Sequence, residues 1–110
     1  KWEKLELVAK AAQNLKEYYN ANNLIMIGHS GGAYTLATIN GRIPKLIDKT
    51  ILISCPCEFE MWKKMKGERV YKMKTSPHKN IDKISKDSQT IIIVGKNDKN
   101  TFPILSINYH

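Results

Sequence analysis

The sharpest chemical pattern in this 110-residue sequence is a serine set among glycines, Gly28-His29-Ser30-Gly31-Gly32. The pattern follows an apolar run at residues 24–27, which predicts a strand, and precedes residues 33–39, which predict a short helix. A serine on a tight turn from a strand into a helix is exposed at the carboxyl end of the strand. Backbone N–H groups and the helix dipole can stabilise negative charge there. The pattern therefore predicts that Ser30 is a nucleophile.

The glycines of this pattern have expected roles of their own. Gly28 and Gly32 lie two positions before and two positions after the serine. They lack Cβ atoms that would crowd such a turn. The backbone N–H of Gly31 is the expected oxyanion donor. The alternative interpretation is a glycine-rich turn in which Ser30 has no chemical role.

A second candidate group follows the last apolar run of the chain. Residues 90–94 are β-branched or apolar, Gly95 ends the run, and Asp98 comes three residues later. An aspartate that follows a strand can hold a histidine in the required tautomer and stabilise its imidazolium form. The alternative is an exposed aspartate in a turn over residues 96–99.

The remaining group that this chemistry needs is a histidine as general base, without which a serine is a weak nucleophile. The chain contains His29, His78 and His110. The His29 side chain is expected to point away from the serine hydroxyl and to pack beside the sheet. We expect His78 in a loop or helix cap and His110 on a last helix that begins near Pro103. The sequence thus leaves the base unassigned.

The spacing of apolar residues predicts the elements that position these groups. Residues 1–20 carry an apolar stripe at steps of three and four, which predicts a helix. The stripe consists of Leu5, Val8, Ala12, Leu15 and Tyr19. Continuous apolar runs at residues 24–27, 50–54 and 90–94 predict strands that are buried on both faces, as in a parallel sheet.

A short helix is also expected near residues 58–66 and a short helix or turn over residues 81–85, with a loop through Ser76-Pro77-His78 between them. Alternating strands and helices predict a single α/β domain over residues 1–110, with a three-stranded parallel sheet flanked by helices. Three strands are few for such a sheet. We therefore expect the chain to be a piece of a larger sheet and a longer protein.

The strand, the G-x-S-x-G turn and the helix together resemble the nucleophile elbow of the α/β-hydrolase superfamily. Residues 91–98 are similar to the later strand of that family that ends in the catalytic acid. The order of serine before aspartate is also the family's order. Ser76-Pro77 and residues 100–103 are similar to the prolyl-oligopeptidase-like and dienelactone-hydrolase-like branches. The resemblance covers the chain but only the middle of the family's fold.

The resemblance implies a serine hydrolase of esterase or peptidase type, acting through an acyl-enzyme. Its nucleophile would be Ser30, its acid Asp98 and one oxyanion donor Gly31. The implied substrate is a small-molecule ester or a peptide, and no metal or organic cofactor is implied. A second interpretation is a non-catalytic remnant of a split or truncated hydrolase. A third is a nucleotide-binding α/β module, although neither G-x-G-x-x-G nor G-x-x-x-x-G-K-[ST] occurs in the sequence.

The charge of the chain is strongly basic, with 18 Lys and Arg against 10 Asp and Glu and a formal net charge of +8. Only Arg42 and Arg69 are arginines, and arginine is the residue preferred for phosphate and base contacts. This composition favours a solvated basic surface over a polyanion site. No apolar run approaches the roughly 20 residues of a membrane span. We expect no nucleic-acid or membrane partner and a cytoplasmic location.

The two cysteines occur in Cys55-Pro56-Cys57. One intervening residue is a poor spacing for a disulfide, and further metal ligands are lacking nearby, so we expect two buried or half-buried thiols in a reducing compartment. Residues 54–75 also contain side chains that either line a pocket beside Ser30 or only cover the sheet. These are Cys55, Cys57, Phe59, Met61 and Trp62.

Overall fold

Strands and helices alternate in the computed structural model, which describes residues 2–57, 61–62, 64, 77–99, 103–104 and 109. The elements in chain order are α1 (Trp2–Tyr18), β1 (Ile25–His29), α2 (Gly31–Arg42), β2 (Lys49–Ile53), the 3₁₀ helix η1 (Pro77–Lys83) and β3 (Gln89–Ile93). This order confirms the predicted α/β fold.

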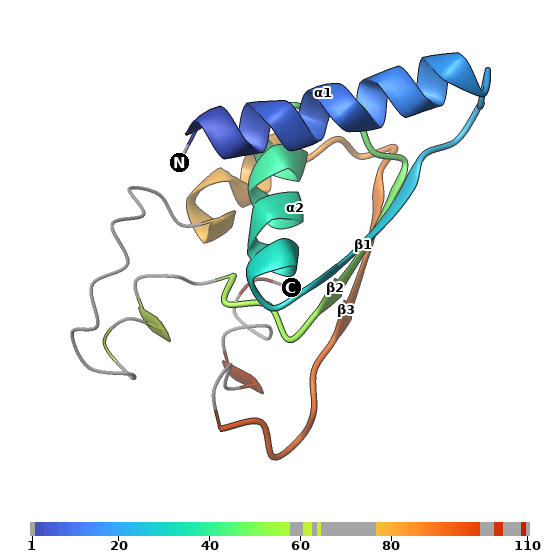
Figure 1. Cartoon of the computed structure of the whole chain (residues 1–110). Helices are drawn as coiled ribbons and strands as arrows, with labels where there is room; N and C mark the ends of the chain where they lie inside the picture. Colours follow the sequence, from blue (N-terminus) through green and yellow to red (C-terminus); the bar gives the residue numbers. More distant parts are fainter. Residues whose placement is uncertain are drawn as a thin grey trace.

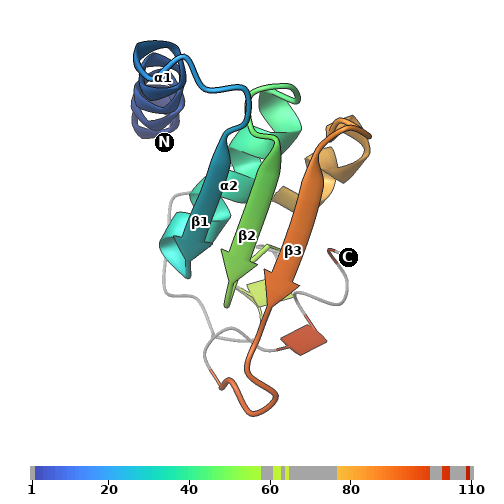
Figure 2. The ribbon, with the colours of Figure 1, turned by 90° about the vertical axis from the view of Figure 1, so that its right-hand side faces the viewer.

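The three strands form one parallel sheet in the order β1-β2-β3 (Figure 2). The register aligns Ile27 with Ile51 and Ile51 with Ile91, so the strands are in step along their length. Because the strands are parallel, their carboxyl ends meet at one edge of the sheet. The segments that leave this edge, after β1, β2 and β3, carry the candidate functional residues.

The covered face of the sheet faces the helices, and α2 and η1 lie on the same side of the strands (Figures 1 and 2). Leu52 from the central strand is fully buried there, and Met26 and Ile92 pack against the same core. The helix α2 supplies Leu36 and Ala37 to this core. Leu52 and α2 thus form the centre of the packed structure.

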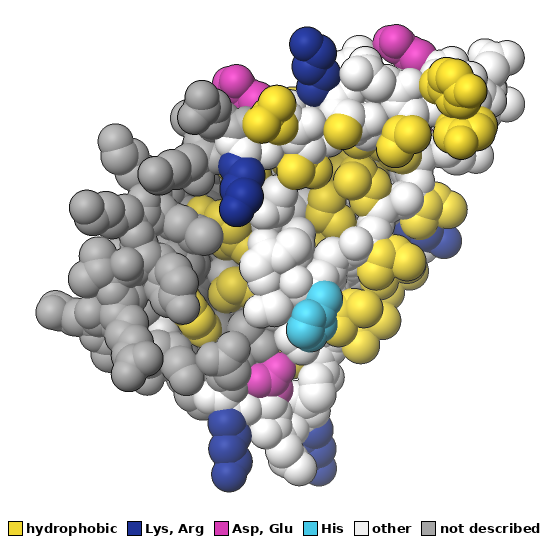
Figure 3. Space-filling model, in the orientation of Figure 1, with side chains coloured by type: hydrophobic (Ala, Val, Ile, Leu, Met, Phe, Trp, Pro, Cys, Tyr) yellow, Lys and Arg dark blue, Asp and Glu magenta, His cyan; other side chains and the backbone are white. Residues whose placement is uncertain are grey.

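The opposite face of the sheet is uncovered, and the prediction of strands buried on both faces is therefore wrong. Alternate residues of β1 and β3, including Ile27 with 65% of its surface exposed, point away from the helices. Hydrophobic side chains accordingly reach the molecular surface over the strands (Figure 3). A continuous apolar run predicts burial, but it does not supply the second layer that burial needs.

The helix α1 is confirmed, but only part of its predicted apolar stripe is buried. Leu5, Ala9 and Ala12 lie in the interior, whereas Leu15 is 56% exposed and Tyr19 is also exposed. The C-terminal end of α1 extends beyond the sheet (Figure 1), so the last part of the stripe meets no core. None of the described helices is long and apolar enough to cross a membrane.

Two element boundaries differ from the prediction. The helix α2 continues through Asn40-Gly41, where the sequence predicted its end. Asn40 is fully buried and its amide donates to the Thr90 hydroxyl at 3.2 Å, so a tertiary contact outweighs the weak helix propensity of this pair. The helix η1 begins at Pro77, where a loop was predicted, since proline suits the first position of a helix.

Two other predicted helices lie mostly outside the described residues. In the first, near residues 58–66, the backbone is helical at residues 61, 62 and 64. In the second, which was expected to begin near Pro103, it is helical at residues 103, 104 and 109.

Candidate functional site

Ser30 lies between the last residue of β1 and the first residue of α2, with φ 53° and ψ −113°. A positive φ is uncommon for a residue with a side chain and costs backbone energy. We call residues 28–31 the Ser30 turn. Strained backbone of this kind persists where surrounding contacts hold it, and it is concentrated at functional sites.

Two backbone hydrogen bonds hold the Ser30 turn in place. The Ser30 N–H donates to the Ile53 carbonyl of β2 at 2.9 Å. The Tyr34 N–H donates to the Ser30 carbonyl at 3.0 Å and begins the hydrogen bonding of α2. The serine is therefore joined to both the neighbouring strand and the following helix.

The Ser30 side chain is half-buried and makes no capping hydrogen bond to α2, although the residue occupies the N-cap position. A serine at this position ordinarily accepts a hydrogen bond from a backbone N–H of the first helical turn. Helix capping therefore does not account for a serine here. The N–H of Gly31 belongs to the first turn of α2, whose N–H groups have no partner within the helix.

Gly28 is required by the close approach of β1 to the start of α2. A Cβ atom at Gly28 would lie 2.6 Å from the Gly32 carbonyl oxygen and 2.8 Å from the Ala33 nitrogen. The expected crowding is thus present at Gly28. It is absent at Gly32, where an added Cβ would meet nothing within 4 Å, so the prediction for that residue's own Cβ is wrong. The backbone of Gly32 is what crowds Gly28.

Asp98 lies in the segment that leaves β3, at the same edge of the sheet as Ser30. Its N–H donates to the Gly95 carbonyl at 3.0 Å, and the residue is half-buried. The strand β2 lies between β1 and β3, so the strands that lead to Ser30 and Asp98 are about 10 Å apart.

The structure tests the expected positions of His29 and, in part, of His78. His29 ends β1 and is exposed on the uncovered face, so the prediction that it packs beside the sheet is wrong. It shares that face with Ile27 because alternate strand residues point the same way. The backbone of His78 lies in η1 rather than in a loop, its side chain is outside the described part, and His110 is outside the described residues.

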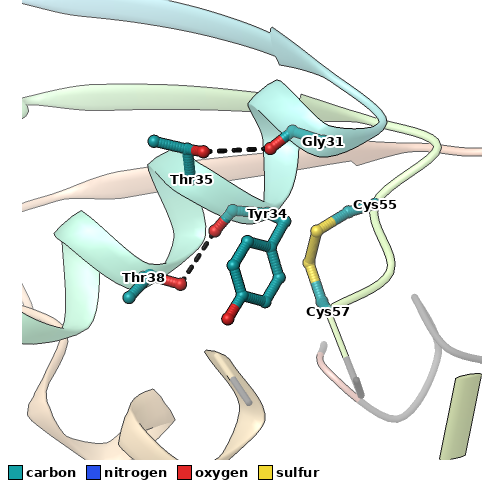
Figure 4. The surroundings of a disulfide bond; sticks show 6 residues. All are labelled: Gly31, Tyr34, Thr35, Thr38, Cys55 and Cys57. Atoms are coloured by element: carbon teal, nitrogen blue, oxygen red, sulfur yellow. Dashed lines mark hydrogen bonds between the residues drawn. A yellow bond between two sulfur atoms is a disulfide. The ribbon is translucent and has the colours of Figure 1, made fainter. Parts of the chain in front are cut away.

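Cys55 and Cys57 form a disulfide, so the expectation of two free thiols is wrong (Figure 4). The backbone after β2 brings their Cα atoms to 5.1 Å, inside the range that a disulfide accommodates. The number of intervening residues was a poor guide to this pair, because the backbone conformation at Pro56 determines the Cα separation. The argument for a reducing compartment from free thiols is thereby removed.

Both cysteines cover the sheet. They are fully buried members of the core that contains Leu36 and Leu52. Trp62 is also buried and Met61 is half-buried, whereas Phe59 lies outside the described residues. For the cysteines, covering the sheet is therefore the interpretation that the structure favours over lining a pocket.

Tyr34 is a residue near the site that the sequence did not indicate. It lies in the first turn of α2, next to the Ser30 turn. Tyr34 is buried and its ring lies beside the Cys55–Cys57 disulfide (Figure 4). The predicted helix over residues 33–39 includes Tyr34, but the position of its ring beside the disulfide was not predicted.

Among the described residues, no group of three or more His, Cys, Asp or Glu side chains could hold a metal ion. No family model, curated protein or solved structure matches the chain. The site is therefore interpreted from its own geometry, which combines a strained serine, a helix N-terminus and an aspartate at one edge of a parallel sheet.

Proposed function

We propose that the chain carries the nucleophile of a serine hydrolase of esterase or peptidase type, with Ser30 as the attacking residue. The observation that carries the proposal is the backbone of Ser30, held at φ 53° between β1 and α2 with its hydroxyl unused by the helix cap. The resemblance of this strand, turn and helix to the α/β-hydrolase superfamily supports the same function.

In the proposed reaction, a base removes the proton of the Ser30 hydroxyl as its oxygen attacks the carbonyl carbon of an ester or peptide. The N–H of Gly31 donates to the developing oxyanion, and the N-terminus of α2 adds its dipole. The leaving alcohol or amine takes a proton as the acyl-enzyme forms, and water then releases the acid. Asp98 is the proposed acid that orients a histidine base and stabilises its charged form.

The test is covalent labelling of the folded chain with a fluorophosphonate, followed by mass spectrometry of the labelled peptide. Phosphonylation of Ser30 is expected in the wild-type chain and its complete loss in Ser30→Ala, because the alanine has no oxygen to modify. Ser54→Ala is the matched control and should retain the label. Ser54 also follows a strand of the sheet with positive φ, 51°, but it does not begin a helix.

Two outcomes would contradict the proposal. One is a folded wild-type chain that takes up no label between pH 7 and 9, which would favour the non-catalytic alternative. The other is labelling that persists unchanged in Ser30→Ala, which would assign the reactive group to another residue.

A further inference from the structure

The Cys55–Cys57 disulfide lies directly beyond β2, at the edge of the sheet that carries the Ser30 turn. Both cysteines are 0% exposed and belong to the same core as Leu36 of α2. Cys55 follows Ser54, whose N–H donates to the Ile93 carbonyl of β3 at 2.8 Å. The disulfide therefore closes the segment that leaves the central strand, and it does so inside the packed core.

The same segment is connected to Ser30 by two routes. One is the backbone, since the Ile53 carbonyl that accepts the Ser30 N–H lies only two residues before Cys55. The other is Tyr34, whose ring lies beside the disulfide (Figure 4). The Tyr34 N–H donates to the Ser30 carbonyl at 3.0 Å. A displacement of the sulfur atoms would therefore shift the Ser30 turn, either through the backbone or through Tyr34.

We propose that the Cys55–Cys57 disulfide is a redox-modification site that regulates the reactivity of Ser30. This inference rests on the proposed function of Ser30 for its regulatory consequence. In the oxidised chain the disulfide and Tyr34 support the Ser30 turn. Reduction releases the segment after β2 and loosens the start of α2, which lowers the reactivity of Ser30.

The physical reason is the packing density of the core. Once the bond is broken, the two sulfur atoms separate to van der Waals contact and need more room than the bonded pair. A close-packed interior transmits such a change to its neighbours, and here one neighbour is Tyr34. Because the disulfide closes a loop of so few residues, it restricts the unfolded chain only a little. Its reduction is therefore expected to have a local effect rather than to unfold the whole chain.

The reduction is an ordinary thiol–disulfide exchange with a dithiol such as dithiothreitol. One thiolate of the reagent attacks a cysteine sulfur, the Cys55–Cys57 bond breaks, and a mixed disulfide forms. The second thiolate of the reagent displaces the cysteine, so the reagent leaves as a cyclic disulfide. Two electrons and two protons pass to the protein, which then holds two thiols. Since both sulfurs are buried, the exchange requires a local opening and should take minutes to hours.

The experiment compares the oxidised and the reduced full chain with two readouts. The redox state is first verified by mass spectrometry after alkylation under denaturing conditions. Hydrogen exchange then measures the amides of residues 30–36, and fluorophosphonate labelling measures the reactivity of Ser30. Reduction should accelerate exchange in residues 30–36 and slow the labelling about tenfold or more, because small misplacements of a reacting group are costly.

Reoxidation should restore both values, and the double variant Cys55→Ala/Cys57→Ala should not respond to the reagent. If that variant does not fold, recovery upon reoxidation serves as the control. Unchanged exchange at residues 30–36 in a chain with two alkylated thiols would overturn the proposal, as would two free thiols in the untreated chain. Unchanged labelling in the reduced chain would also overturn it.

The two readouts distinguish a failure of the serine-hydrolase proposal from a failure of the redox proposal. If neither form takes up the fluorophosphonate but reduction still accelerates exchange in residues 30–36, the serine-hydrolase proposal fails. The coupling between the disulfide and the Ser30 turn would then be supported by the exchange data.

Discussion

Ser30 and Ser54 each leave a strand of the sheet in the same way. Each N–H donates to a carbonyl of the next strand, Ile53 for Ser30 and Ile93 for Ser54, and each residue then has a positive φ. Ser30 alone of these two is followed at once by a helix, so its hydroxyl lies near a helix N-terminus. The helix that follows Ser30 therefore distinguishes this candidate nucleophile from Ser54.

The close contact at Gly28 predicts that alanine substitutions at Gly28 and at Gly32 will differ in their effect on stability. Gly28→Ala should lower the free energy of unfolding by about 1–3 kcal/mol, because its Cβ would lie 2.6 Å from a backbone oxygen that cannot rotate away. Gly32→Ala should change it by less than about 1 kcal/mol, and in the stabilising direction, since alanine restricts the unfolded chain. Urea unfolding measures both.

The two variants are matched, since each adds one methyl group within two residues of Ser30. Equal destabilisation by both would contradict the role assigned to the Gly28 contact. A neutral Gly28→Ala variant would contradict it as well.

At the scale of elements, Asp48 connects the amino ends of the three strands. Its carboxylate accepts a hydrogen bond from the Leu24 N–H at 2.7 Å and pairs with Lys16 of α1 at 3.4 Å. Its backbone N–H donates to the Leu24 carbonyl, and its carbonyl accepts from the Gln89 N–H. One residue thus determines how β1, β2 and β3 begin relative to one another.

These contacts make the stability of the fold dependent on pH in the acid range. The hydrogen bond from the Leu24 N–H lowers the pKa of Asp48 below its usual 3.8, and Lys16 adds to this against the opposing effect of burial. Because the folded pKa is lower than the unfolded one, the ionised carboxylate stabilises the fold above about pH 4. That contribution is lost as the pH falls through the folded pKa.

Asp48→Asn should therefore be less stable than wild type at pH 7, and the difference should shrink between about pH 5 and pH 2. Urea unfolding at a series of pH values measures it. Asp82→Asn, which removes a negative charge from an exposed position on η1, is the control and should leave the pH dependence in place. A constant difference between wild type and Asp48→Asn at all pH values would contradict the assignment.

At the scale of the whole molecule, the sheet has one covered face and one uncovered face. The helices α2 and η1 lie on one side of the strands (Figure 2). On the other side the isoleucines of β1 and β3 are exposed, and hydrophobic side chains reach the surface there (Figure 3). The apolar residues of each strand are therefore unequal in their contribution to stability, although the sequence shows them as one continuous run.

Truncation of one residue on each face tests this difference. Leu52→Ala, on the covered face, should lower the free energy of unfolding by about 2–5 kcal/mol, because the residue is fully buried. Ile27→Ala, on the uncovered face, should lower it by about 1 kcal/mol or less. Urea unfolding followed by circular dichroism measures both values. Similar losses in the two variants would mean that the second face is also buried in solution.

The sequence by itself determined the features that depend on neighbouring residues. The apolar runs and their periodicity predicted α1, the three strands and the α/β order, since each of these patterns acts within a single element. The position of Ser30 between β1 and α2 was also predictable, because the glycine pattern and the change of period lie within a few residues of it.

Only the tertiary structure decided which of these residues meet. Exposure of His29 and the open second face depend on how the layers pack, and the pairing of Cys55 with Cys57 depends on the backbone conformation after β2. The continuation of α2 through Gly41 depends likewise on the contact of Asn40 with Thr90, which is fifty residues away. Local patterns contain the preferences of a segment, whereas burial and pairing are properties of the surfaces that the folded chain brings together.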